Sequence, residues 1–152
     1  GEEITLRIRK SDDEKTTFGG GVLYLDMQNP YDSEKVRKRW ESFMTDMCRD
    51  YFPSALSRMR SLLSDYRIPT PCMRIRVMKS RWGSCTPKKQ TVTLNRRLIE
   101  ADRECIDYVI LHELCHFVYA DHSARFHALM SRLMPDWKIR RKRLNQSVSL
   151  TQ

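Results

Sequence analysis

The pentapeptide HELCH at residues 112–116 constrains the fold of this chain more than any other segment. Residues four apart lie on one face of an α-helix, so a helical segment places the side chains of His112 and His116 side by side. Two imidazoles placed in this way can bind one metal ion, and zinc accepts nitrogen ligands in a tetrahedral shell. Glu113 follows one step round the helix, where its carboxylate can reach water held at the metal. The pentapeptide therefore predicts a helical metal site with an adjacent acid/base group.

A catalytic zinc ion usually has three protein ligands and one open position. We expect His122 to be the third ligand, because a helix break near residues 120–121 lets the chain turn back towards the metal. All four histidines of the chain fall within sixteen residues, which favours a metal site over a set of buried structural histidines. His127 is expected beside the site or at the surface. The sequence therefore predicts one zinc ion held by His112, His116 and His122.

The balance of charged residues points to the kind of partner. The chain has 28 Lys and Arg residues against 19 Asp and Glu residues, a formal net charge of +9. Such an excess favours anionic partners, among them nucleotides and nucleic acid. No apolar run approaches the length of a membrane-spanning helix, so we expect no membrane contact. The five cysteines are odd in number and form no CxxC pair, which favours reduced thiols and a cytoplasmic location; the oligomeric state stays open.

Hydrophobic periodicity predicts one α+β domain over residues 1–152. Its expected parts are a strand and turn region at 1–30, a helical region at 33–66, a β-hairpin at 72–95 and active-site helices at 102–145. Pro53 should kink or split the long helix, and the strands at 73–77 and 91–94 should pair through a turn containing Gly83. The helix that carries the pentapeptide should run from Asp102 to about Ala120. We thus expect a small antiparallel sheet packed against the long N-terminal helix and the active-site helix.

Four segments also follow the order seen in a known family. They are KSRWGSC at 79–85, LNRRLI at 94–99, IDYVILHELCH at 106–116 and DHSARF at 121–126. In this order they resemble the YgjP-like proteins, small bacterial and archaeal proteins described as zinc-dependent metallopeptidases or metal-dependent hydrolases. The resemblance covers about residues 70–145 and implies the minimal zincin-like fold, with a more distant similarity to SprT-like proteases. It also implies that His112, His116 and His122 are zinc ligands and that Glu113 is the catalytic acid/base.

The tetrapeptide RWGS at 81–84 supplies two candidate substrate-binding residues, Arg81 and Trp82. In zincins a strand beside the active-site helix can bind an extended peptide by backbone pairing, and Arg81 could hold an anionic group or stabilise an oxyanion. The structural alternative is that Trp82 fills the core, Gly83 serves the turn and Arg81 is solvated. Both interpretations of Arg81 and Trp82 stay open.

The site residues predict a zinc-dependent hydrolase, and the family resemblance favours a metallopeptidase in which zinc-bound water is activated by Glu113. One alternative is a metal-dependent hydrolase of nucleotides or phosphate esters, which the charge of +9 would suit. Another is a nucleic-acid-binding module in which zinc is structural. A structural site would be closed by a fourth protein ligand, and no cysteine stands at a suitable spacing.

Overall fold

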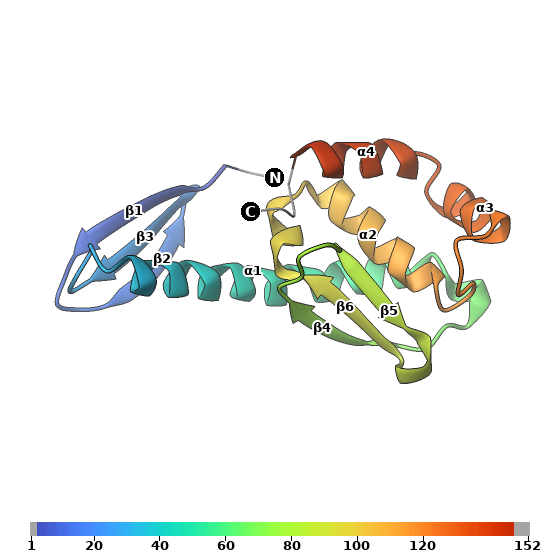
Figure 1. Ribbon diagram of the computed structural model, residues 1–152, viewed down its shortest axis with the longest axis horizontal. Helices are drawn as coiled ribbons and strands as arrows, with labels where there is room; N and C mark the ends of the chain where they lie inside the picture. Colours follow the sequence, from blue (N-terminus) through green and yellow to red (C-terminus); the bar gives the residue numbers. More distant parts are fainter. Residues whose placement is uncertain (1–2, 148–152) are drawn as a thin grey trace.

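The computed structural model describes residues 3–147, with one small sheet at the start of a long helix and a second sheet near its end (Figure 1). The N-terminal part contains β1 (Thr5–Lys10), β2 (Lys15–Gly19), β3 (Val22–Met27) and α1 (Ser33–Ser61). The strands β4 (Cys72–Arg76), β5 (Gly83–Thr86) and β6 (Thr91–Asn95) precede the helices α2 (Arg103–Cys115), α3 (Ala124–Leu133) and α4 (Trp137–Ser147). Short 3-10 helices lie between them: η1 (Ser64–Tyr66), η2 (Pro87–Lys89) and η3 (Arg96–Glu100). The predicted α+β class is confirmed.

The first sheet has the strand order β1-β3-β2, with β1 parallel and β2 antiparallel to β3. The side chains of Leu23, Leu25 and Met27 form a small core against Trp40 and Phe43 of α1. The main core is separate and joins α1, α2 and the second sheet. The sequence does not predict β2, because all of its residues are exposed and they show no apolar alternation.

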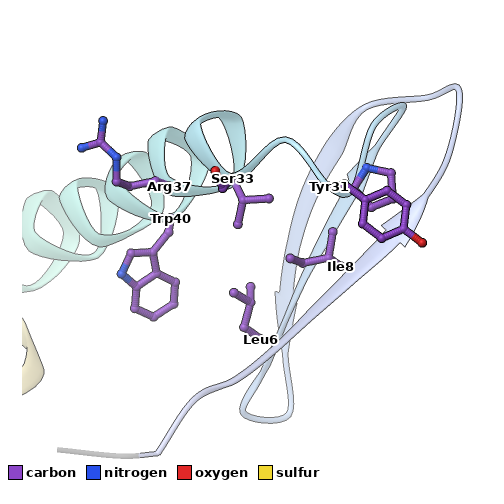
Figure 2. Close-up of a pocket in the computed structure, with 8 residues that line it drawn as sticks. Leu6, Ile8, Tyr31, Ser33, Arg37 and Trp40 are labelled. Carbon is purple, nitrogen blue, oxygen red and sulfur yellow. The ribbon is translucent and has the colours of Figure 1, made fainter.

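An apolar groove of about 570 Å³ lies between β1 and the start of α1 (Figure 2). Leu6 and Ile8 of β1 line one side, Val36 and Trp40 of α1 line the other, and Tyr31 lies near Ile8. None of the residues that line this groove is a histidine, a cysteine or a carboxylate. The groove therefore offers no metal ligand and is not the candidate site.

Helix α1 continues through Pro53, so the helix is not split there. Proline removes one backbone donor and crowds the preceding turn. Pro53 is exposed, so water can hydrate the carbonyl group that loses its partner. Phe52, Leu56 and Met59 are buried in the main core, and the burial of these apolar side chains outweighs the cost of the proline.

The second sheet has the order β4-β6-β5, and its strands do not pair as the sequence predicts. β4 and β6 are neighbours but run parallel, whereas β5 and β6 are antiparallel. The hairpin at 72–95 is therefore wrong as an antiparallel pairing of 73–77 with 91–94, and the sheet is mixed. Alternation of apolar and polar residues indicates that a segment is a strand but not in which direction its neighbour runs.

The buried side chain of Asn95 explains how the chain crosses from β4 to β5. Its amide nitrogen donates to the carbonyl oxygens of Met78 and Arg81 at 2.7 and 2.9 Å. The backbone N–H of Asn95 donates to the carbonyl of Trp82 at 2.9 Å. These bonds hold the connection between β4 and β5 across the end of β6, so that β5 pairs with the far edge of β6.

Helix α2 packs against α1, the second sheet and α4, and most of its side chains are buried. It ends at Cys115, five residues before the predicted end at Ala120. The backbone N–H groups of Phe117 and Val118 donate to carbonyls three residues back, a tighter turn than that of the α-helix. Among residues 3–147, no helix is both long and apolar enough to cross a bilayer.

Ion pairs hold the first sheet together and attach it to α1. Arg9 donates to both carboxylate oxygens of the buried Asp26, at 2.6 and 2.9 Å. Glu14 accepts hydrogen bonds from Lys35 at 2.7 Å and from Arg39 at 2.8 Å, both on α1. The bond from Arg9 lowers the pKa of Asp26, and the bond from Lys35 lowers the pKa of Glu14. Both carboxyl groups therefore stabilise the fold in their charged form.

Acid should loosen the first sheet. The pKa values of Asp26 and Glu14 are lower in the folded state than in the unfolded state. Their charged forms therefore stabilise the fold above about pH 4, and this stabilisation is lost as the pH falls through the folded-state pKa values. Asp26→Asn should remove the stabilisation that Asp26 contributes, even at neutral pH. The backbone amides of β1 and β3 should then exchange hydrogen faster than in the wild type. Hydrogen-exchange mass spectrometry measures this, with Asp46→Asn on the exposed side of α1 as control. Equal exchange in wild type and Asp26→Asn would contradict the role of this ion pair.

Candidate metal centre

The structure brings the three predicted ligands together at the C-terminal end of α2. His112 lies in the last turn of α2, His116 caps this helix, and His122 lies on the connection to α3. One ligand atom of each residue lies within 4.8 Å of the other two. The Nε2 atoms of His112 and His122 are 2.9 Å apart. Two nitrogen ligands of one tetrahedral zinc ion stand roughly 3.4 Å apart, so this donor set fits zinc with a small adjustment.

The ring of Phe126 packs against all three imidazoles. Phe126 lies in the first turn of α3 and is fully buried. Its centroid is 4.9, 4.8 and 4.9 Å from those of His112, His116 and His122. The Nδ1–H of His116 also donates to the carbonyl of Tyr119 at 3.2 Å, which leaves Nε2 for a metal. The Nδ1 atom of His112 is buried without a hydrogen-bond partner among residues 3–147, so packing orients this ring.

Burial keeps two of these imidazoles neutral, which is the form that binds a metal. Burial lowers the pKa of His112 to about 3, and positive charge on His116, His122 and Arg141 acts in the same direction. Burial also lowers the pKa of His116, against the hydrogen bond to Tyr119, which raises it. Neither ring therefore holds a second proton at neutral pH.

Glu113 lies beside the cluster and is 7% exposed. Burial raises the pKa of its carboxyl group to about 7, while the positive charge of Arg81 lowers it. The side chain of Glu113 packs against the backbone of Gly83 in β5. A Cβ atom at position 83 would lie 2.7 Å from Cγ and 2.8 Å from Oε1 of Glu113, closer than real Cβ contacts. Only glycine therefore leaves room for Glu113 in its present position.

The RWGS segment lies along the entry to β5 rather than in a turn. Gly83 is the first residue of β5 and pairs with Leu94 of β6. Trp82 is half-buried and packs against the main core. Arg81 is exposed and forms no ion pair within the described part of the chain. The sequence does not predict the contact of Gly83 with Glu113, although an isolated glycine in a strand is a signal of close backbone approach.

A stack of aromatic rings borders the cluster on the side of α4. Trp137 stacks on Tyr108, with centroids 6.3 Å apart, and on His127, with centroids 5.5 Å apart. Tyr108 lies four residues before His112 on α2, and their centroids are 6.0 Å apart. His127 does not belong to the ligand cluster. Sequence reasoning misses Tyr108 and Trp137, because aromatic residues at helical spacing are more often core residues.

Three convergent histidines beside a buried carboxylate are the groups that a metal-dependent hydrolase requires. The chain belongs to the YgjP-like family, whose metallopeptidase domain matches residues 1–147. The resemblance inferred from the four sequence segments is thereby confirmed.

Solved structures with a similar fold include two metallopeptidase zymogens. The metallopeptidase zymogen abylysin of Pyrococcus abyssi has 24% sequence identity and a TM-score of 0.57, over 63% of this chain and 93% of abylysin. The metallopeptidase zymogen jannalysin of Methanocaldococcus jannaschii has 24% identity and a TM-score of 0.54, over 63% of this chain and 88% of jannalysin. Comparison with curated protein sequences finds no match.

We predict that His122→Ala weakens zinc binding far more than His127→Ala does. The first change removes a nitrogen of the cluster, whereas His127 contributes none. Loss of a residue that hydrogen-bonds to a metal ligand typically lowers metal affinity about 10–100-fold. Loss of the ligand itself should therefore lower the affinity by more than about a hundredfold. Titration against a chromophoric chelator measures both affinities. Equal losses in the two variants would remove His122 from the ligand set.

A second prediction concerns Gly83→Ala. The three atoms nearest to the added Cβ atom all belong to Glu113, which is not part of the ligand cluster, so zinc content should stay near that of the wild type. A misplacement of about 1 Å at a reacting group can cost about a hundredfold in rate, and we expect a loss of kcat of this order on a peptide library. Ser84→Ala is the control, because adjacent residues of a strand face opposite sides. An unchanged kcat in Gly83→Ala would show that this contact does not position Glu113.

Proposed function

We propose that residues 1–152 form one catalytic domain, a zinc-dependent metallopeptidase of the cytoplasm. His112, His116 and His122 would hold one zinc ion, and Glu113 would act as the acid/base. The observation that carries the proposal is the three-histidine cluster beside a buried carboxylate. In the described part of the chain no fourth His, Cys, Asp or Glu joins the cluster, which is the pattern of a catalytic zinc site and not of a structural one. The nucleic-acid-binding module with structural zinc is therefore the weaker alternative.

Glu113 carries the proton transfer in this proposal. Zinc, when bound, would lower the pKa of water to about 7 and polarise the scissile carbonyl. The carboxylate of Glu113 takes a proton from the attacking water and passes it to the leaving amine as the peptide bond breaks. Burial keeps bulk water away from this carboxylate, and the contact with Gly83 fixes its position.

An extended peptide would bind along β5. β6 is the one strand that pairs with β5 in the described residues, so no strand pairs with the other edge of β5. The backbone groups of a free edge can pair with an added peptide strand. Because Gly83 of β5 touches Glu113, a peptide bound there would pass beside the acid/base. Arg81 and Trp82, which lead into β5, are the proposed substrate contacts.

A hydrolase of nucleotides or other phosphate esters is the second candidate. The observation that favours it is Arg81, an exposed cation whose charge acts on Glu113 and which could pair with a phosphate. We favour the peptidase because the family is one of metallopeptidases. Zinc-loaded protein distinguishes the two: a peptidase releases new amino termini from casein peptides, and a phosphate-ester hydrolase releases phosphate or pyrophosphate from nucleoside triphosphates.

The acid/base role predicts the behaviour of Glu113→Gln. The substitution keeps size and polarity but removes the group that accepts the proton, so peptide hydrolysis should fall by roughly a hundredfold to ten-thousandfold. Zinc content should stay near that of the wild type, because Glu113 is not part of the ligand cluster. Mass spectrometry of bound metal and cleavage of the casein peptides measure both properties.

The matched control is Glu34→Gln on the exposed start of α1, which should leave both properties unchanged. If Glu113→Gln lost its zinc, the residue would be a ligand or a support of the fold. If it kept both zinc and the wild-type rate, hydrolysis would not depend on Glu113, and the proposed mechanism would be wrong.

A further inference from the structure

The second sheet lies in a stretch of chain without a carboxylate. Residues 66–99 contain no Asp or Glu and nine basic residues. These are Arg67, Arg74, Arg76, Lys79, Arg81, Lys88, Lys89, Arg96 and Arg97. The remaining 19 basic residues equal the 19 acidic ones in number, so this stretch accounts for the whole net charge of +9.

Most of these cations have no acidic partner. Arg96 pairs with Glu41, and Arg97 pairs with Glu100. The other seven are exposed and form no ion pair within residues 3–147. The positive charge of the molecule is therefore concentrated on the second sheet and its connections, which include the strand beside Glu113.

Arg81 places part of this charge at one side of the candidate site. Its backbone carbonyl is held by Asn95, two residues before the glycine that touches Glu113. The guanidinium is exposed, yet near enough for its charge to lower the pKa of Glu113. An anionic group of a ligand that lies beside β5 would therefore meet Arg81 without displacing an existing partner.

Arg141 supplies a second cation from α4, which packs on the other side of α2 from the second sheet (Figure 1). It lies four residues after Trp137, so both project from the same face of this helix, and Trp137 stacks on Tyr108 and His127. Arg141 is exposed and has no ion pair among residues 3–147. Its charge acts on both Tyr108 and His112. Helix α2, which carries His112 and Glu113, thus lies between the two elements that supply these unpaired guanidinium groups.

We propose that this site selects peptides with acidic side chains on both sides of the scissile bond, and that Arg81 and Arg141 bind these side chains. This inference rests on the proposed peptidase function and adds its substrate class. Each arginine offers an exposed, unpaired cation to a carboxylate of the substrate, and ion pairs of this kind weaken with salt.

The distribution of aromatic residues favours an acidic peptide over single-stranded nucleic acid. Proteins that bind single strands combine a basic groove with exposed aromatic rings on which bases stack. The large exposed aromatic side chains in the described residues are Phe18 and Tyr31. Phe18 lies in β2 and Tyr31 between β3 and α1, at the first sheet and not at the second. No fully exposed aromatic ring of the described residues therefore lies on the basic surface for bases to stack on, and Trp82 beside Arg81 is half-buried against the main core.

The test measures binding apart from turnover. Zinc-loaded Glu113→Gln protein is titrated with three peptides of equal length, whose residues flanking the central bond are all Glu, all Gln or all Lys. Two exposed ion pairs should favour the Glu peptide over the Gln peptide by about tenfold, and about 0.5 M salt should remove most of the difference. Arg81→Gln and Arg141→Gln should each reduce the ratio, and the double variant should bring it close to one.

Arg37→Gln is the matched control, because Arg37 lies at the start of α1 beside the groove of Figure 2 and should leave the ratio unchanged. Equal affinity for the Glu and Gln peptides, or an equal effect of Arg37→Gln, would overturn the inference. Tighter binding of a single-stranded oligonucleotide, with the same dependence on Arg81 and Arg141, would also overturn it. Selective binding of the Glu peptide without cleavage by the wild-type protein would support the binding of acidic side chains by Arg81 and Arg141 but would refute the peptidase function on which the substrate class rests.

Discussion

The contact of one buried ring with three imidazoles determines how this site is built. Two of the histidines belong to α2 and its cap, but His122 lies beyond the end of that helix. Phe126 at the start of α3 packs against all three rings. This packing holds the connection between α2 and α3 against the face of α2 that carries His112 and His116. The packing of Phe126 against these rings brings the three nitrogens together, so part of the entropy of gathering the ligands is lost on folding.

Glu113, the proposed acid/base, is positioned by a second contact, between α2 and β5. Glu113 fills the space that a side chain at Gly83 would occupy, and Asn95 fixes the chain just before this glycine. The edge strand β5 and the buried carboxylate thus meet at one contact between β5 and α2. A substrate that pairs with β5 would be placed relative to Glu113 by the sheet itself, without movement of a loop.

The sequence predicts the parts of this site that local spacing determines. His112, Glu113 and His116 follow from a helical repeat, and His122 follows from the need for a third ligand after a helix break. The parallel pairing of β4 with β6 does not follow, because it depends on hydrogen bonds from Asn95 to residues 14 and 17 positions earlier. The continuity of α1 through Pro53 is equally non-local, since it depends on burial against elements that come later in the chain. The place of Gly83 could be inferred only once β5 was known to lie against α2.

Helix α1 fixes the rotation of the first sheet relative to the second sheet about the axis of this helix. It is 29 residues long, about 43 Å at 1.5 Å per residue, with the first sheet at its start and the catalytic part around its second half (Figure 1). Each residue of an α-helix adds about 100° of rotation. A single inserted or deleted residue in the middle of α1 would therefore turn the first sheet by more than a quarter of a circle around the catalytic part, while leaving both cores intact. The number of residues in α1 therefore fixes the rotation of the first sheet about the helix axis. This number, more than the composition of α1, determines which face of the first sheet is turned towards the second sheet and α2.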